Sequence, residues 1–428
     1  MAALTDRLID FSAGAVPQSA REMMRLSLFD WAACGIAGAQ LSEYDGFLAR
    51  LHATGGASEA FVLGGGALPA ATAALINGTL SHALDYDDTH FAHIGHPSVA
   101  VIPAVLAVAE RTGADLAAVI DAATIGVEAS IHVGIWLGRG HYQVGFHQTA
   151  TAGAFGATLG VARVLGLSSA QTRTALGLCA SMASGIKAQF GTMAKPLNAG
   201  LAARTGVEAT EWAQVGLTAA ADGLAGPLGF GPTHHGAADE GALAAMGQVP
   251  WQIESISHKY HACCHGLHAM LEALRDVTVD PAQINAIQIR THPRWMTVCN
   301  IPDPQTGLAA KFSYGQTSAM TLLGHDTGAI SSFTDAITQD RAVTDLRDKV
   351  SVREDDRLTE TQTEVSLILT TGQHLRLRHD LMAPMEIAER AHKLQVKASA
   401  LIGTPKAELL WHASQGDETA ALLTILSD

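Results

Sequence analysis

The first part of the chain, up to about residue 248, repeats one pattern of long segments with apolar residues at helical spacing, separated by short breaks. Apolar positions three and four residues apart are typical of helices that bury one face. Ser98 and Ser168 supply start signals, and Gly113 and Gly166 follow apolar segments as stop signals. No segment before residue 280 alternates as a strand should. The pattern predicts helices over residues 19–37, 70–85, 98–112, 114–137, 149–165, 169–186 and 196–216.

The pattern changes after residue 248. Residues 284–292 alternate apolar and polar positions, as a half-buried strand does. Two further alternating runs, joined by a Thr-Thr-Gly turn, predict a hairpin over residues 363–369 and 374–379. Helices are predicted over residues 264–276, 312–324 and 337–349, and helical spacing returns after Pro384.

These two patterns predict a mainly α protein with two domains. A large all-helical domain comprises residues 1–248 plus the C-terminal tail, 384–428, and a smaller α+β lid domain, 249–383, is inserted into it. Basic residues follow the same division, since 11 lie in residues 1–250 and 16 in residues 251–428. An inserted domain covering one face of the first favours an active site between the domains.

Composition narrows the functional classes. The 428 residues are 48% hydrophobic, 16% charged and 5% aromatic, with a net charge of −14, which argues against disorder and against binding to nucleic acid or anionic membranes. No uninterrupted apolar stretch reaches the roughly 18 residues of a spanning segment. The N-terminal segment carries charges within its apolar part, unlike a signal peptide. Five cysteines without a CxxC pattern favour a reducing, cytoplasmic location.

Histidine is the unusual component, with 20 in the chain. Histidine titrates near neutral pH and is the commonest proton-transfer side chain, and it also binds metals. The densest cluster lies between the predicted helices that end and begin near residues 82 and 98. It holds four histidines and three carboxylates, namely His82, His90, His93, His96, Asp85, Asp87 and Asp88. A solvated, hydrogen-bonded loop is the plain alternative, but such titratable density is typical of a functional site.

Metal binding is one interpretation of this loop. His90, His93 and His96 recur at intervals of three, and the neighbouring aspartates could complete a ligand set for a metal-dependent hydrolase. The Gly-His-Pro sequence at residues 95–97 cannot be helical throughout, so this spacing does not place the three rings on one helix face. We therefore predict no metal, and keep the hydrolase as a weaker alternative.

A second motif, Gly-Thr-Met-Ala-Lys-Pro-Leu-Asn, covers residues 191–198. Lys195 lies in an apolar turn directly before a helix that starts with proline, and a helix N-terminus attracts anions. The lysine and the free N–H groups predict a site for a carboxylate or phosphate; the alternative is a surface lysine whose stem covers apolar surface.

Two further motifs carry histidine. Residues 257–268, Ser-His-Lys-Tyr-His-Ala-Cys-Cys-His-Gly-Leu-His, combine a cation, imidazoles and thiols, but Cys263 and Cys264 are adjacent and lack zinc-ligand spacing. No nucleophile elbow accompanies them, so a loop that faces substrate is the simplest interpretation. His147 begins a predicted helix, where a cap or core role is the ordinary alternative.

Taken in order, these blocks resemble the MmgE/PrpD family, which includes 2-methylcitrate dehydratase, cis-aconitate decarboxylase and iminodisuccinate epimerase. The resemblance is carried by sequences spread over nearly the whole chain: HALDYDDTH and HPS (82–98), GFHQTATAGAFGA (145–157), GTMAKPLNAGLAARTGVEA (191–209), HKYHACCHGLHA (258–269) and AAKFSYGQTSAM (309–320). It implies an all-helical domain with an inserted lid, a homodimer, and no metal or organic cofactor.

The resemblance also implies roles for individual residues. The residues that look like the family's catalytic set are Asp85, His96, His147 and Lys195, and those that look like substrate-binding residues are Thr89, Lys259, His261, Cys263 and Tyr314. Departures from the family pattern surround this set. Asn198 stands where a histidine is common, His261 where a proline is common, and Cys263 at what looks like a histidine position; Tyr314 also looks shifted.

The resemblance implies a cofactor-free lyase that acts on a small di- or tricarboxylate by breaking a C–H or C–C bond next to a carboxylate. Lys195 and Lys259 would hold carboxylates, His96 and Asp85 would move protons, and His147 would bind a carboxylate or act as a second acid–base group. An epimerase of an amino-dicarboxylate such as iminodisuccinate is the first alternative. The metal-dependent hydrolase and a non-catalytic binding protein are weaker alternatives.

Overall fold

The computed structural model describes residues 4–427 and divides into two compact units. Unit 1 comprises residues up to His258 together with those from Ile402 onward, and unit 2 comprises Lys259–Leu401. The predicted boundaries, after residues 248 and 383, both lie earlier. The difference arises because residues 249–258 pack within unit 1, whereas the helix after Pro384 packs within unit 2.

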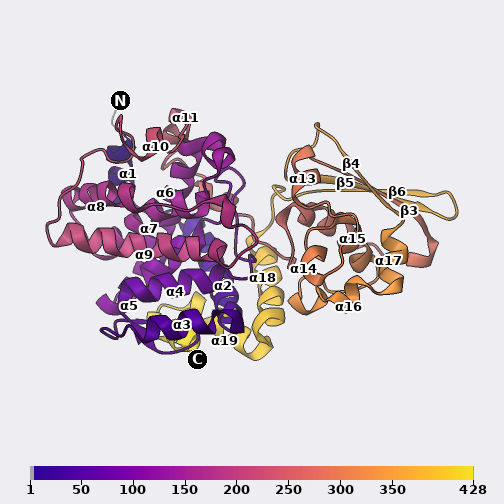
Figure 1. Ribbon diagram of the computed structural model, residues 1–428, viewed down its shortest axis with the longest axis horizontal. Helices are drawn as coiled ribbons and strands as arrows, with labels where there is room; N and C mark the ends of the chain where they lie inside the picture. Colours follow the sequence, from indigo (N-terminus) through magenta and orange to yellow (C-terminus); the bar gives the residue numbers. More distant parts are fainter. Residues whose placement is uncertain (1–3, 428) are drawn as a thin grey trace. The chain divides into compact units, whose positions relative to one another are not determined.

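Unit 1 is almost entirely helical (Figure 1). Its helices are α1 (Leu4–Ser12), α2 (Gln18–Gly38), α3 (Asp45–His52), α4 (Ala70–His82), α5 (Ser98–Thr112), α6 (Leu116–Val144), α7 (Gln148–Val164), α8 (Ser169–Met182), α9 (Ala194–Gln214), α10 (Phe230–Thr233), α11 (Glu240–Ala244), α19 (Thr404–Gln415) and α20 (Thr419–Ser427). The predicted helices are confirmed, with ends shifted by a few residues. Two 2-residue strands, β1 (Ala60–Phe61) and β2 (Ala67–Leu68), form a small antiparallel ribbon that the alternation pattern did not predict.

The core of unit 1 is made of small residues that let helices approach closely. Helix α9 packs against α4, α5, α7 and α8, and α7 also packs against α5 and α6. Where α4 meets α9, a Cβ atom on Gly78 would lie only 2.9 Å from the Cα atom of Gly200. Larger residues at this crossing would force the two helices apart, so the glycines set their separation.

Helix α6 is long and apolar enough, by length and composition alone, to cross a membrane. However, 83% of the most apolar part of this helix is buried inside the protein. It contacts α2, α5, α7 and α11, and it bends at Gly138, whose φ of 77° is not helical. A helix that is apolar on all sides and surrounded by other helices is typical of a buried core helix.

Unit 2 combines a four-stranded sheet with short helices (Figure 1). Its elements are α12 (His268–Leu274), β3 (Ile284–Thr291), α13 (Pro293–Val298), α14 (Gly307–Ala310), α15 (Tyr314–Leu322), α16 (Asp335–Thr338), α17 (Arg341–Arg347), β4 (Val350–Glu354), β5 (Gln362–Leu369), β6 (His374–Asp380) and α18 (Ile387–Ile402). The strand order is β4-β3-β5-β6, with β3 and β4 parallel and the other pairs antiparallel. The predicted strand and hairpin are therefore confirmed, and β4 was missed.

The sheet of unit 2 buries one face. Along β5, buried and half-buried residues alternate strictly, and Val365 and Leu367 lie on the buried side. Helix α12 covers β5 and β6. The prediction of a mainly α protein with a smaller α+β part is confirmed by this architecture.

Candidate active site

The predicted catalytic residues of unit 1 meet where three helices present their ends. His82 is the last residue of α4, His147 is the residue before α7, and Lys195 lies in the first turn of α9. The loop between α4 and α5 supplies Asp85 and His96. Because α9 packs against both α4 and α7, residues more than a hundred positions apart in sequence come together.

Lys195 and Asp85 form the outer end of a chain of paired charges. The Nζ atom of Lys195 lies 2.5 Å from Oδ1 of Asp85, and Nε2 of His96 lies 3.2 Å from the same oxygen. The side chain of Asp85 is 43% exposed, whereas that of Lys195 is 16% exposed. Asp85 thus connects a lysine and an imidazole to the solvent side of the cluster.

Asp87 forms the inner end of this chain. One of its oxygens lies 2.8 Å from Nδ1 of His82 and the other lies 3.0 Å from Nδ1 of His96. Asp87 is almost completely buried, and burial by itself would raise the pKa of its carboxyl group. The two imidazoles outweigh that effect and hold the pKa of Asp87 far below its usual value. Asp87 therefore remains a buried anion.

His96 lies between two carboxylates, and this decides its charge. Burial lowers the pKa of His96, but Asp87 and Asp85 reverse the effect and raise the pKa above its usual value of 6.5. Both ring nitrogens face carboxylate oxygens, so both carry a proton in the charged form. We conclude that His96 favours the imidazolium form and is suited to donate a proton.

His82 shares Asp87 with His96 but favours the neutral form, whereas His96 favours the charged form. Burial, only partly offset by Asp87, lowers the pKa of His82 to about 4. Its ring packs edge-on against the ring of His96, with centroids 4.6 Å apart. A neutral His82 donates its Nδ1–H to Asp87 and so supports the carboxylate that holds His96.

His147 is the fourth predicted catalytic residue, and it lies beside the chain of charges. Its ring stacks on His82, with centroids 6.2 Å apart, and its Nδ1 atom lies 3.2 Å from Nδ2 of Asn198. Burial, reinforced by the positive charge of Lys195, lowers the pKa of His147 well below 6.5. Unlike His96, this histidine is neutral near pH 7.

Thr89, predicted to bind substrate, lies farther along the same loop. Its backbone pairs with Ser257 in an antiparallel bridge, and its hydroxyl donates a hydrogen bond to the Ser257 carbonyl at 3.3 Å. These bonds fasten the loop to residues 255–257 of unit 1. A contact between Thr89 and substrate stays a prediction.

The proposed metal-ligand set is not assembled. Nε2 of His90 bonds to Ser255, and its Nδ1 accepts from the backbone N–H of His93. Nε2 of His93 bonds instead to Ser130 on α6. Within residues 4–427, His90 and His93 belong to no group of metal-ligand type, so the hydrolase interpretation of this spacing is wrong in its geometry. The spacing misled because the loop turns between these residues.

One set of ligand-type side chains, His82, Asp87 and His96, does lie close enough to hold an ion. Oδ1 of Asp87 already pairs with Nδ1 of His82 through a 2.8 Å hydrogen bond, and its other oxygen lies 3.0 Å from Nδ1 of His96. The hydrogen bond between His82 and Asp87 therefore accounts for this part of the arrangement without a metal.

The predicted residues of unit 2 surround the turn that precedes α12. Nδ1 of His261 bonds to Thr327 at 2.7 Å, and Nε2 lies 3.3 Å from Glu272. Burial raises the pKa of the Cys263 thiol, although Lys259 opposes this, so Cys263 is no thiolate nucleophile at neutral pH. Lys259 is itself buried.

Tyr314 has a structural role within unit 2. It is fully buried, its hydroxyl donates to the Gly266 carbonyl at 2.6 Å, and it shares a 2.8 Å hydrogen bond with Thr291. These bonds join α15 and β3 to the turn that carries Cys263. A contact between Tyr314 and substrate stays a prediction.

Sequence reasoning did not select three residues of the site: His82, Asp87 and Asn198. His82 and Asp87 were part of the dense loop, and a carboxylate five positions after a histidine gave no helical or strand spacing to connect them. Asn198 was noted as a departure from the family pattern, and that departure was the available signal.

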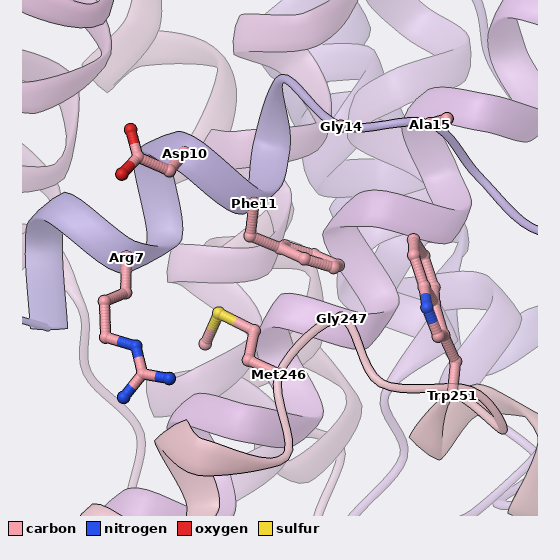
Figure 2. A pocket seen from close by; sticks show the side chains of 8 residues that line it. All are labelled: Arg7, Asp10, Phe11, Gly14, Ala15, Met246, Gly247 and Trp251. Atoms are coloured by element: carbon pink, nitrogen blue, oxygen red, sulfur yellow. The ribbon is translucent and has the colours of Figure 1, made fainter.

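A separate pocket of about 390 Å³ lies elsewhere in unit 1 (Figure 2). It lies against α1 and the segment before Trp251, where Phe11 and Trp251 face each other with centroids 5.0 Å apart. None of the predicted site residues lines it. The cluster at the ends of α4, α7 and α9 is therefore the better candidate for catalysis.

The protein therefore combines a helical unit that carries a lysine–carboxylate–imidazole chain with a smaller α+β unit. The chain belongs to the MmgE/PrpD family. Residues 2–243 match the MmgE/PrpD N-terminal domain and residues 261–410 match the MmgE/PrpD C-terminal domain. The two matches correspond to most of unit 1 and most of unit 2.

Several curated relatives are similar over part of their length. Human cis-aconitate decarboxylase is 34% identical over 172 residues, which cover 38% of this chain and 35% of the relative. The cis-aconitate decarboxylase-like protein oryM of Aspergillus oryzae is 30% identical over 223 residues, 47% of this chain and 45% of the relative. Cis-aconitate decarboxylase of Aspergillus terreus is 28% identical over 278 residues, 61% and 56% respectively. The chain thus spans between about a third and just over half of these relatives.

Proposed function

We propose that this protein is a lyase that removes a carboxyl group from a small unsaturated tricarboxylate of the cis-aconitate type. The observation that carries the proposal is the imidazolium of His96, held between Asp85 and Asp87 and next to Lys195. The names of the relatives support the same reaction class. A site of this kind supplies a proton donor and a cation without a metal.

The reaction makes clear demands on the site. In cis-aconitate, one carboxylate lies on a CH2 group next to the double bond. When its C–C bond breaks, CO2 leaves, the electron pair forms a new terminal double bond, and the original double bond takes up a proton at its far carbon. The product is a methylene-substituted dicarboxylate. The reaction therefore needs one proton donor and fixed positive charge at the carboxylates.

His96 is the proton donor in this proposal. Its raised pKa keeps the proton available near neutral pH, and Asp87 holds the ring in one orientation. After transfer, neutral His96 recovers a proton through Asp85, the more exposed member of the chain. Asp85 is therefore a proton relay in this proposal.

Lys195 provides the fixed charge in unit 1. In the substrate-free protein its charge is neutralised by Asp85. A substrate carboxylate that displaces this contact gains a cation inside a partly buried site, where charge–charge interactions are stronger than in water. Lys259 and His261 stay candidates for substrate binding from unit 2. A cytoplasmic location, based on the cysteine pattern, and a homodimer, based on the family resemblance, remain part of the proposal.

The test is incubation of the protein with cis-aconitate in D2O, followed by NMR. We expect loss of the substrate vinyl signal, release of CO2, and a product with one solvent deuterium on its saturated carbon. Parallel incubations with 2-methylcitrate and iminodisuccinate test the family's dehydratase and epimerase reactions. Turnover of either one, with cis-aconitate left intact, would overturn the proposal.

A further inference from the structure

Asn198 contacts two groups whose chemistry fixes the orientation of its amide. It lies one turn into α9, three residues after Lys195, and is 7% exposed. Its Nδ2 atom lies 3.2 Å from Nδ1 of His147 and 3.5 Å from the carbonyl oxygen of Ile186. A carbonyl oxygen only accepts hydrogen bonds, so the amide end that faces Ile186 is the NH2 group.

This orientation determines which nitrogen of His147 carries the proton. The second hydrogen of the same NH2 group points to Nδ1 of His147, which must then accept it. A neutral imidazole with Nδ1 as acceptor carries its proton on Nε2. Among residues 4–427, Nε2 of His147 makes no hydrogen bond, so this N–H is available to a ligand.

We propose that Asn198 is a positioning residue that holds His147 as the neutral Nε2–H tautomer, so that His147 donates a hydrogen bond to a substrate carboxylate and does not serve as the base. The catalytic consequence rests on the proposed function. The tautomer itself rests only on the contacts of Asn198. A histidine at position 198, as is common in the family pattern, could accept a hydrogen bond from Nδ1 of His147, whereas the NH2 group of this amide can only donate one.

The charges around His147 agree with a neutral ring. Burial has the largest effect on its pKa, and Lys195 on α9 lowers the pKa further, with smaller contributions from His82 on α4 and His96 in the loop. Asp85 opposes them more weakly. The amide of Asn198 adds no negative charge that would stabilise an imidazolium.

The ring is also held in place. The backbone N–H of His147 donates to the Gly185 carbonyl at 3.0 Å, and residues 146 and 186 pair in an antiparallel bridge. Gly185 has a φ of 135°, and a Cβ atom there would lie 2.7 Å from Ala150. The ring of His147 also contacts His82, which stacks on it at 6.2 Å, and Phe190, which packs edge-on at 5.0 Å, and these contacts favour one ring orientation.

The test reads the tautomer directly. The protein is labelled with ¹⁵N-histidine, and long-range ¹H–¹⁵N correlation spectra at pH 7.5 are recorded for the wild type and for Asn198→Asp, with His147→Gln identifying the His147 signals. We expect the Nε2–H pattern in the wild type. In Asn198→Asp the carboxylate accepts from Nδ1, so we expect the Nδ1–H or the doubly protonated pattern. Asn285→Asp, the same change at an exposed site on β3, should leave the pattern unchanged.

Activity is measured on the same variants. With cis-aconitate we expect Asn198→Asp to lower kcat/KM on the order of 10²-fold, because an oriented donor to developing charge is lost. An Nδ1–H or imidazolium pattern in the wild type overturns the inference, as does an unchanged pattern in Asn198→Asp. If the wild type shows Nε2–H but does not convert cis-aconitate, the proposed function fails and the assignment of Asn198 stands.

Discussion

The end of α4 and the loop that follows it carry two pairs of buried histidines with opposite chemistry. His82 and His96 share the carboxylate of Asp87, and we call this the carboxylate-held pair. His90 and His93 bond to Ser255 and Ser130, and we call this the hydroxyl-held pair. Burial lowers the pKa of His90 to about 4 and that of His93 to about 3.

The difference shows that burial alone does not make a histidine catalytic. Of the four rings, only His96 has a raised pKa, because it alone faces two carboxylates. His82 faces one carboxylate and stays neutral. The hydroxyl-held pair fastens the loop to the rest of unit 1, and the carboxylate-held pair supplies the charge. The following predictions test this division.

The largest effect is expected for Lys195→Met. It removes the cation beside the carboxylate-held pair, so we expect kcat/KM for cis-aconitate to fall on the order of 10³-fold. The fold should persist, because partly exposed ion pairs add little stability. Steady-state kinetics and thermal unfolding check both points.

Lys187→Met is the matched control for this variant. Lys187 lies in the neighbouring turn, where it donates to the Tyr142 carbonyl and lies over the Tyr142 ring. Near-normal kinetics are expected. Equal losses in the two lysine variants would show that the effect of Lys195 is not specific to its pairing with Asp85.

A smaller effect is expected for Asp87→Asn, which makes the carboxylate-held pair resemble the hydroxyl-held pair. The raised pKa of His96 keeps it protonated, so activity is present below that pKa and is lost as pH rises through it. Without the Asp87 charge the pKa of His96 falls, and activity should be lost at lower pH. At pH 7.5 we expect a loss of about 10²-fold.

The measurement is the pH profile of kcat/KM. Asp88→Asn serves as the comparison, because Asp88 accepts a hydrogen bond from Ser98 and not from either imidazole of the pair. In Asp88→Asn, kcat/KM should fall at high pH over the same pH range as in the wild type. A basic limb that is unmoved in Asp87→Asn would contradict the role of His96 as the acid.

The smallest effect on activity is expected for His93→Gln. The change removes the hydrogen bond to Ser130, so we expect unfolding at pH 7.5 to become easier by about 1–3 kcal/mol, with the pH profile of activity unchanged. In the wild type the pKa of His93 is lowered to about 3, so the stability tied to it is present above about pH 6.5 and is lost as pH falls towards 3.

Denaturant unfolding at pH 7.5 and pH 5 tests this sign. The free energy of unfolding of His93→Gln should fall less between the two pH values than that of the wild type. His52→Gln, at an exposed position on α3, should behave as the wild type. A shift in the pH profile of kcat/KM in His93→Gln would contradict the proposed difference in role between the two histidine pairs.

The helices and most of the sheet were predictable because apolar spacing reports directly which faces are buried. The small β1–β2 ribbon was missed because two residues are too few to alternate. Strand β4 was missed because it follows α17 closely and only two of its five residues are partly buried. The helix after Pro384 was assigned to the wrong unit. Apolar spacing shows that a helix is amphipathic, but it does not show which unit the helix packs against.

Within the site, sequence indicated the residues but not their partners. Lys195 and His96 were selected by motif and resemblance, and the structure brings both to Asp85. The metal alternative for His90 and His93 arose because regular spacing in a loop says nothing about where side chains point. Asp87 was overlooked because its importance lies in two contacts formed only after the loop folds back.

The close crossing of α4 and α9 at Gly78 and Gly200 has a consequence for engineering this protein. The two helices carry opposite ends of the reacting cluster, so the spacing of Lys195 from the α4 loop is controlled by positions that have no side chain. A methyl group added at either glycine would push the two helices apart. The distance between Lys195 and Asp85, several residues away, would then change. Redesign of substrate preference should therefore leave this crossing untouched and vary the exposed rim residues Ile186, Phe190 and Met193 instead.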